Sequence, residues 1–412
     1  IVNSTSWRVT KPLRILSKSL KNLFRFKNLK LNKKIKDEET REILVDITHV
    51  YKDDLKTGIQ RVVRSILEEL KNNRQLENVK IEAVFLTDKD GFWSYRYANN
   101  EEQIVSPCNG DIFLGLDLNS TVIESHALFD DWKNKGVQIN FVIYDILPIL
   151  YPQWWEKEVS KIHEKWLVKI LDYSSTVICI SKSVADEVNE YINSNNLNLN
   201  KISKVKWFHL GADVENSIPS KGIPQDNEII LEKFRKNITF LMVGTIEPRK
   251  GHVQVLKAFE LLWSKGISVN LVIVGKMGWH MNSFVSQVDK HSELDNKLFY
   301  LNQVSDEYLE LIYKNCTCLV AASEAEGFGL PLIEAARHNI PIFARDILVF
   351  REVVEDGAFF FKNTKKGDDL AEEITNWIEL YQQNIHPISS SVKSYTWEKS
   401  VQALIKLINI KN

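Results

Sequence analysis

The sequence predicts an α/β protein that consists of two doubly wound units, each with a parallel sheet between helices. Its 412 residues are more than one ordinary hydrophobic core can organise, so two domains are expected. From residue 43 onward, short apolar runs of strand length alternate with runs of helical spacing, which is typical of parallel sheets. A polar stretch with two prolines, residues 215–227, separates these runs into two sets.

The composition limits the classes of protein to which the chain can belong. With 44% hydrophobic and 26% charged residues the chain is of the globular type, and no run of about 18 apolar residues predicts a membrane span. The four cysteines form neither a disulfide framework nor a zinc motif, and three of them lie in apolar runs. These features favour reduced thiols in a cytoplasmic protein.

The first 36 residues carry eleven Lys and Arg and no Asp or Glu. Their leucines and Phe24 recur at helical spacing, which predicts a basic amphipathic segment. Such a segment is typical of attachment to an anionic membrane surface, here the inner face of the cytoplasmic membrane. A solvated helix, or one that packs on an adjoining catalytic domain, is the equal alternative. Because the chain begins with Ile, we also expect that it was cut from a longer polypeptide.

In the first unit, apolar strands are expected at residues 43–47, 80–86, 111–115, 137–143 and 176–180. A loop with Gly58 at its tip leads into a helix that carries Arg61 and Arg64 in its first turns. Surface solvation is the plain interpretation of these arginines, and it is favoured for Arg64. Asp145 follows the strand that ends at residue 143. Ligands of doubly wound sheets bind at the carboxyl ends of strands, so Asp145 is placed where chemistry would occur or, alternatively, caps the next segment.

In the second unit, strands are expected at residues 238–243, 269–274, 298–301, 317–321, 341–344 and 358–361. The first of them leads directly into Gly244 and then into the adjacent cations Arg249 and Lys250. A forked guanidinium and a compact ammonium together suit a diphosphate that becomes more negative as its sugar leaves. Two exposed cations on a loop are the alternative.

The strand at 317–321 precedes a glycine-bearing loop and a helix with Pro331 in its first turn. The free N–H groups of such a helix start form an anion site. Two carboxylates, Glu326 and Glu334, flank this site eight positions apart. Carboxylates accept hydrogen bonds from sugar diols, so amides and carboxylates together favour a nucleotide-sugar. A Gly-rich turn without such a ligand is the alternative.

Residues 326–334, Glu-Gly-Phe-Gly-Leu-Pro-Leu-Ile-Glu, resemble the Glu-x7-Glu motif of retaining glycosyltransferases of family 4, which have the GT-B fold. Residues 244–251 resemble the Gly-Arg-x4-Lys-Gly phosphate clamp of this family, with Thr245 at the position of the first arginine. Residues 144–148 are similar to its His-Asp-Leu-x-Pro segment, with Tyr144 in place of the histidine that contacts the donor sugar. The resemblance extends from residue 42 to about 408 and is strongest over 238–338.

The resemblance implies two facing Rossmann-like domains with an interdomain cleft. The basic segment or linker would cover residues 1–40 and the acceptor-side N-terminal domain residues 41–214. A linker, residues 215–236, would precede the nucleotide-sugar domain at 237–392. The last helix, within residues 393–412, would return to the N-terminal domain.

The resemblance also implies roles for individual residues. Arg249 and Lys250 would stabilise the leaving diphosphate, Glu326 would hold sugar hydroxyls near the reacting carbon, and Asp145 would serve the acceptor. Glu334 would accept from the ribose diol. The full set of donor-binding residues would be Gly58, Gly244, Gly327, Phe328, Gly329, Leu330, Glu334, Lys276 and Val304, the last two near the base. No metal is expected, since helix N-termini together with Arg249 and Lys250 can carry the charge of the diphosphate instead.

The implied reaction is metal-independent hexosyl transfer, with retention, from a nucleoside diphosphate sugar to a hydroxyl of a glycan or lipid-linked glycan. GDP-mannose is the first expectation for the donor and dTDP-rhamnose the second, as in bacterial O-antigen and lipopolysaccharide synthesis. No nucleic-acid partner is expected. The alternatives are another GT-B enzyme, such as a nucleotide-sugar epimerase, and a catalytically silent module that the basic segment anchors in an assembly complex.

Overall fold

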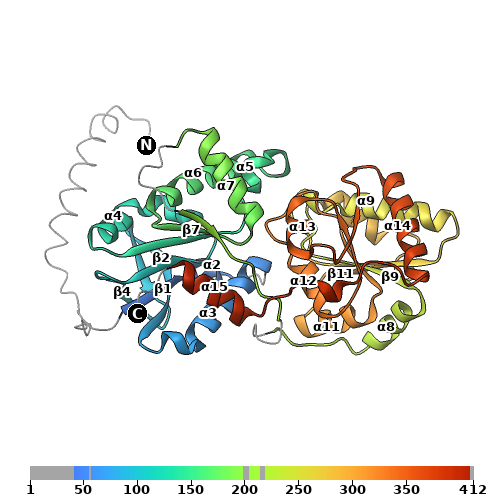
Figure 1. Ribbon diagram of the computed structural model, residues 1–412, viewed down its shortest axis with the longest axis horizontal. Helices are drawn as coiled ribbons and strands as arrows, with labels where there is room; N and C mark the ends of the chain where they lie inside the picture. The colour runs from blue at the N-terminus through green and yellow to red at the C-terminus, as the bar shows by residue number, and fades with distance from the viewer. Residues whose placement is uncertain (1–40, 55–56, 198–203, 214–218, 409–412) are drawn as a thin grey trace, which may run out of the picture. The chain divides into compact units, whose positions relative to one another are not determined.

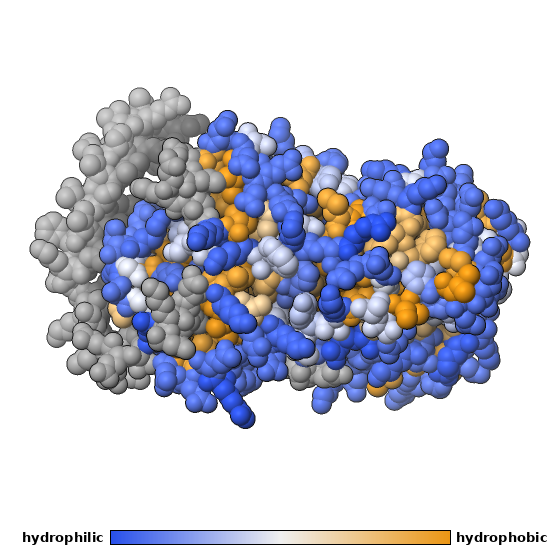
Figure 2. All heavy atoms as spheres, viewed as in Figure 1, coloured by the Kyte–Doolittle hydropathy of each residue, from blue (hydrophilic) through white to orange (hydrophobic). Residues whose placement is uncertain are grey.

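The computed structural model describes residues 41–54, 57–197, 204–213 and 219–408 (Figure 1). The basic segment and its predicted membrane or domain partner lie outside these residues. None of the helices in the described part of the chain is both long and apolar enough to cross a bilayer. Where Figure 2 displays this part of the surface, hydrophilic residues cover most of it and apolar residues lie among them in small groups.

The N-terminal sheet contains eight strands within the described residues, in the order β4-β3-β2-β1-β5-β6-β7-β8. Neighbouring strands from β2 to β8 pair in parallel, as predicted, whereas β2, β3 and β4 form an antiparallel meander at one edge. The bounds are β1 Arg41–Asp46, β2 Val79–Lys89, β3 Phe92–Tyr97, β4 Asn100–Ile104, β5 Ile112–Gly115, β6 Gln138–Ile143, β7 Thr176–Cys179 and β8 Lys204–Trp207.

The meander was not predicted. Asp90 and Gly91, the two residues between β2 and β3, both have positive φ angles, 57° and 83°. An Asp-Gly pair is a strong signal for a two-residue hairpin turn, because its backbone twist matches that of the flanking strands. The sequence therefore held the information for this hairpin.

Helices cover the N-terminal sheet where apolar side chains recur at helical spacing. Their bounds are α2 Thr48–Lys52, α3 Gly58–Asn72, α4 His126–Asn134, α5 Leu147–Leu150, α6 Lys157–Tyr173 and α7 Lys182–Ser194, with 3₁₀ turns η1 Arg74–Leu76, η2 Ser120–Ser125 and η3 Pro152–Trp154. The start of α3 is fixed by Thr57 and Gln60, whose side chains accept from each other's backbone N–H. The buried residues Val63, Ile66 and Leu70 line the inner face of α3, as the spacing predicts.

The C-terminal sheet is parallel throughout its described strands, in the order β11-β10-β9-β12-β13-β14. The bounds are β9 Ile238–Val243, β10 Val269–Val274, β11 Leu298–Leu301, β12 Cys318–Ala321, β13 Ile342–Arg345 and β14 Phe359–Phe361. The predicted fold class, α/β with two doubly wound units, is confirmed. Because parallel strands end at one edge, the loops after β9, β10, β11 and β12 meet there.

The helices of the C-terminal sheet are α8 Asn227–Lys236, α9 His252–Ser264, α10 Asn282–Asp289, α11 Asp306–Asn315, α12 Leu330–Arg337, α13 Leu348–Val354 and α14 Gly367–Gln382, with 3₁₀ turns η5 Pro248–Lys250 and η6 Ser389–Ser391. Helices α9 and α14 lie side by side (Figure 1).

Helix α8 falls within the segment predicted as a linker, residues 215–236. Its Phe234 is buried and packs edge-on against Phe299 of β11 at 5.0 Å, so this part of the segment belongs to the C-terminal core.

The last helix, α15 Trp397–Leu407, packs against α3 of the N-terminal sheet (Figure 1). The N–H of Trp397 donates to Asp213 Oδ1 at 2.6 Å, and Ser400 donates to the carbonyl of His209 at 2.7 Å. A Cβ on Gly211 would lie 2.5 Å from the Trp397 nitrogen, so this close approach requires glycine. The chain thus crosses from the C-terminal sheet back to the N-terminal one.

Candidate functional site

Two loops bring opposite charges into contact at the carboxyl edge of the C-terminal sheet. The turn η5 after β9 carries Arg249 and Lys250, and the loop after β12 carries Glu326. Arg249 Nη1 lies 2.7 Å from Glu326 Oε2, and Lys250 Nζ donates to Glu326 Oε1. Ser323 also donates to Glu326 Oε1, at 2.7 Å, and Arg249 Nε lies 3.0 Å from Glu247 Oε2. The structure therefore joins the three residues that were predicted to act at the transferring bond.

These side chains are largely buried, with exposed fractions of 12% for Arg249, 17% for Lys250 and 10% for Glu326. Burial alone would raise the pKa of Glu326, but the charges of Arg249 and Lys250 outweigh it and lower that pKa to about 2. Burial raises the pKa of Glu247 against the opposing effect of the same two cations. Glu326 is thus a firmly ionised carboxylate whose position depends on its two cationic partners.

The low pKa of Glu326 predicts a specific acid sensitivity. Because the folded pKa of about 2 lies below the ordinary value of 4.5, the carboxylate stabilises the fold above pH 4.5 and loses this contribution as the pH falls toward 2. The shift corresponds to about 3 kcal/mol, so the unfolding free energy should fall by this much more in the native protein than in Glu326→Gln. Urea titrations from pH 6 to pH 3 measure most of the difference. Parallel curves for the two proteins would contradict the ion cluster.

Gly327 lies against the N-terminal sheet. A Cβ at this position would sit 2.0 Å from the carbonyl oxygen of Tyr144 and 3.2 Å from the Cβ of Asp145. Ser181, at the start of α7, donates to the Gly327 carbonyl at 2.7 Å. The family resemblance places this glycine among the donor-binding residues. In the structure the close approach is to the segment that follows β6.

The neighbouring residues form the start of α12. Gly329 is left-handed, with a φ angle of 98°, and a Cβ there would lie 2.9 Å from Phe350. Phe328 is buried and meets the ring of His209 edge-on at 5.5 Å. Leu330 is the first helical residue. The loop therefore packs against Phe350 and His209, and the free N–H groups of α12 lie at the same edge as the ion cluster.

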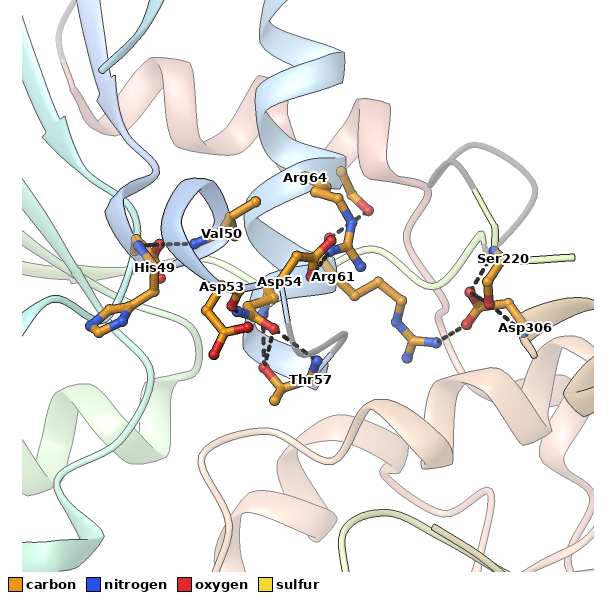
Figure 3. Close-up of polar contacts among 12 residues, drawn as sticks. His49, Val50, Asp53, Asp54, Thr57, Arg61, Arg64, Ser220 and Asp306 are labelled. Atoms are coloured by element: carbon orange, nitrogen blue, oxygen red, sulfur yellow. Dashed lines mark hydrogen bonds and ion pairs between the residues drawn. The ribbon is translucent and has the colours of Figure 1, made fainter. Parts of the chain in front are cut away.

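Glu334 is buried in α12, and both of its carboxylate oxygens have protein partners. Arg61 of α3 donates through Nη2 to Glu334 Oε1, and the Tyr313 hydroxyl donates to Oε2 at 2.9 Å. Arg61 Nη1 also lies 3.7 Å from Asp306 Oδ1. Figure 3 shows Arg61 extending from α3 to Asp306, which in turn contacts Ser220. The carboxylate predicted to accept a ribose diol is thus occupied by an arginine from the other sheet's domain.

Asp145 makes a local contact: its Oδ1 accepts from the N–H of Leu147 at 3.1 Å. Leu147 is the first residue of α5, whose N-cap position is Ile146, so Asp145 holds the turn that precedes this helix. Its charge also acts on neighbouring groups. Burial and then the charge of Asp145 raise the pKa of Glu187 to about 7, and the buried Glu187 Oε2 has no hydrogen-bond partner among the described residues.

The other predicted site residues lie around these clusters. Gly58 begins α3, and a Cβ there would be in ordinary contact with Leu330 at 3.9 Å. Gly244 has a φ angle of 141° and lies beside Lys250, because a Cβ on this glycine would be 3.8 Å from Lys250 Nζ. Lys276 and Val304 follow β10 and β11 at the same edge of the sheet. Both are therefore on loops that reach the edge where the ion cluster lies.

A small cavity of about 30 Å³ adjoins the ion cluster, lined by Lys250, His252, Ser323, Glu326 and the start of α12. This volume holds roughly one water molecule. His252 is buried, and its Nδ1 has no hydrogen-bond partner among the described residues. Burial and then the charge of Lys250 lower the pKa of His252 to about 3, so the imidazole is neutral near pH 7.

Sequence reasoning missed Tyr313, Ser323 and His252, and it left Arg61 open. Ser323 follows β12 directly, so its place at the carboxyl edge of the sheet was a usable signal. Tyr313 and His252 lie on helices with other apolar residues and read as core side chains. For Arg61 no local pattern marks the contact, because its partner Glu334 is 273 positions away.

A known protein-family model matches the part of the chain that contains these loops. Residues 225–393 match the family model described as "Glycosyl transferases group 1". This range includes η5, the loop after β12 and α12. The match therefore covers the ion cluster and Glu334, whereas Arg61 and Asp145 lie outside it.

Among curated proteins, the chain is similar to the Escherichia coli "Serotype-specific mannosyltransferase WbdA", with 38% identity over 387 residues. The alignment covers 90% of this chain and 47% of that protein. It is also similar to the "O-antigen chain mannosyltransferase RfbU" of Salmonella typhimurium, with 28% identity over 58% of this chain and 64% of that protein. The chain spans about half the length of the first of these curated relatives.

Among solved structures, the crystal structure of Anabaena Alr3699/HepE in complex with UDP and glucose is similar, with a TM-score of 0.56. The alignment covers 90% of this chain and 96% of that chain at 15% sequence identity. At this identity the likeness concerns the fold. It extends over both sheets, since it covers nearly all of the described residues.

Proposed function

We propose that this chain, whose residues 225–393 form a glycosyl transferases group 1 domain within a GT-B fold, transfers mannose from a nucleoside diphosphate sugar to a growing surface glycan. The observation that carries the proposal is the cluster of Arg249, Lys250 and Glu326 beside the free N–H groups of α12. Cations and helix amides together suit a diphosphate, and a fixed carboxylate suits sugar hydroxyls.

In the proposed reaction, each charged residue of the cluster has its own role. The acceptor oxygen forms a bond to the anomeric carbon while the bond from that carbon to the diphosphate oxygen breaks. Arg249 and Lys250 offset the negative charge that grows on the diphosphate. The acceptor proton passes to the departing phosphate, so no separate general base is required and the anomeric configuration is retained. Glu326 holds the sugar hydroxyls, and Asp145 orients the acceptor hydroxyl.

The names of the relatives support mannose as the transferred sugar and an O-antigen or related glycan as the acceptor. GDP-mannose is accordingly the proposed donor, and dTDP-rhamnose is the second choice. The proposal concerns the reaction of this chain alone, because it spans about half of the WbdA relatives. Lys276 and Val304 are placed to contact the base, and metal-independent transfer is proposed because Arg249 and Lys250 can neutralise the diphosphate.

The donor requires movement at the site. A nucleotide-sugar needs a pocket of several hundred Å³, whereas the cavity beside the ion cluster has about 30 Å³. Gly327 lies against Tyr144, and Arg61 occupies Glu334. We therefore propose that the loop after β12 and the segments that contact it separate when the donor binds.

The chain is also proposed to work at the cytoplasmic face of the membrane, where a lipid-linked acceptor would be held. This part of the proposal depends on the basic segment, residues 1–36, with its eleven cations. Adjoining catalytic domains are the other proposed partner of this segment. Sedimentation with vesicles that contain phosphatidylglycerol, compared for the full chain and a chain without these residues, separates the two partners.

A nucleotide screen tests the donor. We expect GDP to raise the melting temperature of the protein more than UDP or dTDP does, because a ligand that binds only the folded state stabilises it by mass action. The release of nucleoside diphosphate from GDP-mannose should depend on a mannose-containing glycan acceptor. Release without any acceptor would indicate an epimerase or hydrolase instead. Failure of all three nucleotides to bind would indicate a catalytically silent assembly module.

A further inference from the structure

We propose that Arg61 controls donor binding by occupying Glu334, so that the ribose diol of the nucleotide must displace it toward Asp306. This inference rests on the proposed function, because it takes Glu334 as the acceptor of the ribose hydroxyls. It adds a residue outside the family-model match, on a helix of the N-terminal sheet, and assigns it a role in setting nucleotide affinity.

The contact between Arg61 and Glu334 is built into the fold. The exposed fraction of the Glu334 side chain is 3%, and that of Arg61 is 16%. Burial would lower the pKa of Arg61, but the charges of Glu334 and then of Asp306 raise it. Both carboxylate oxygens of Glu334 are used, one by Arg61 and one by the Tyr313 hydroxyl at 2.9 Å. A buried carboxylate with these partners has no open side for a diol.

Asp306 provides a second position for the guanidinium. Its Oδ1 lies 3.7 Å from Arg61 Nη1, beyond hydrogen-bond distance but close enough for attraction. Its Oδ2 accepts from the N–H of Ser220 at 2.8 Å and from the Ser220 hydroxyl at 2.7 Å, which fixes the carboxylate (Figure 3). A small rotation of the Arg61 side chain therefore exchanges one carboxylate partner for another, and the charge is never left without a partner.

When Arg61 moves to Asp306, a ribose hydroxyl can replace it as the hydrogen-bond donor to Glu334. After Arg61 withdraws, Oε1 needs a hydrogen-bond donor, and a ribose hydroxyl supplies one. Tyr313 keeps Oε2 in place throughout. Gly58, the first residue of α3, already lies close to Leu330 at the start of α12, so Arg61 approaches from the side on which the donor phosphates are proposed to lie.

The arrangement predicts the sign of the effect of Arg61 on affinity. A ligand that must first displace a competing group binds with an apparent affinity reduced by the fraction of molecules in the open state. Removal of Arg61 should therefore strengthen nucleotide binding. If Arg61 instead contacted the donor phosphates directly, its removal should weaken binding, as is usual for a phosphate-binding arginine. The two interpretations differ in direction, so one titration decides between them.

The experiment is calorimetric titration of the full chain with GDP and with UDP. For Arg61→Ala we expect the dissociation constant of the better nucleotide to fall by about tenfold, together with a lower melting temperature of the unliganded protein. Arg64→Ala is the matched control, because Arg64 lies one turn further along α3 and pairs with Asp54 at 2.6 Å (Figure 3). Its affinity should equal that of the unmodified chain. Weaker or unchanged binding by Arg61→Ala would overturn the inference.

A second variant distinguishes the proposed role of Arg61 from a folding defect in Arg61→Ala. Asp306→Asn keeps an oxygen for Ser220 but removes the charge that receives the displaced Arg61. It should weaken nucleotide binding by about threefold or more, the opposite sign to Arg61→Ala. General destabilisation cannot give opposite signs for these two substitutions. Equal or tighter binding by Asp306→Asn would show that Asp306 does not receive the guanidinium.

The role of Glu334 itself is measured separately. In the unmodified chain 2′-deoxy-GDP should bind more weakly than GDP, and Glu334→Gln should reduce this difference. If none of GDP, UDP and dTDP binds the unmodified chain, the proposed function fails. If they bind but Arg61→Ala does not tighten the complex, only the role assigned to Arg61 fails.

Discussion

Glu326→Gln is expected to reduce hexosyl transfer by at least about a hundredfold. The carboxylate touches both proposed phosphate-binding cations, Arg249 at 2.7 Å and Lys250 through its ammonium, and it accepts from Ser323 at 2.7 Å. Glutamine keeps the size of the side chain but removes the charge and turns N–H groups toward two cations. The measurement is the rate of nucleoside diphosphate release from GDP-mannose with a glycan acceptor.

Glu324→Gln is the matched control for this prediction. It lies in the same loop, two residues before Glu326, and pairs with the exposed Lys365 at 2.6 Å. Its turnover should remain within a few-fold of the native rate. From the sequence one expects Glu326→Ala to abolish turnover and leave the fold intact. The structure adds that alanine leaves two largely buried cations without their partner, so a loss of stability is expected as well. Native turnover in Glu326→Gln would refute the assigned role.

The second large effect is expected for Lys250→Ala, which should lower kcat by about a hundredfold to a thousandfold. The Lys250 side chain is 17% exposed, and its ammonium contacts Glu326 and lies beside Gly244 at the end of β9. Its proposed work is to offset charge that appears only as the diphosphate leaves, so kcat should fall more than nucleotide affinity does. Single-turnover rates and GDP titrations measure the two effects separately.

Lys265→Ala serves as the control for lysine removal in the same helix–sheet unit. Lys265 is exposed at the end of α9, the helix that begins next to Lys250. Its removal should leave turnover unchanged. A Lys250→Ala enzyme that lost affinity and kept its single-turnover rate would place Lys250 in ground-state binding alone.

Much of the fold follows from local patterns in the sequence. The expected strands at 238–243, 269–274 and 298–301 match β9, β10 and β11 residue for residue. Buried parallel strands read as short continuous apolar runs, and helices between them separate the runs clearly. The same patterns fail where elements are small. The spacing of apolar residues over 153–171 predicts one amphipathic helix, whereas α6 begins at Lys157, after the turn η3 at Pro152–Trp154.

The candidate site was predictable to the extent that it depends on strand ends. Gly244, Arg249, Lys250 and Glu326 all follow β9 or β12, which pair directly, so their convergence follows from the parallel sheet. Contacts that join the two sheets were not predictable in this way. The occupation of Glu334 by Arg61, and the approach of Gly327 to Tyr144, depend on how two separate cores pack, and no short sequence pattern records that packing.

The return of α15 to the N-terminal sheet has a consequence for biosynthesis. Val401 and Leu404 are fully buried where α15 meets α3, so the apolar face of α3 is complete only when this helix is present. On the ribosome, the C-terminal sheet emerges before α15 does. The first half of the chain must therefore wait, with part of its core uncovered, until α15 has also been synthesised.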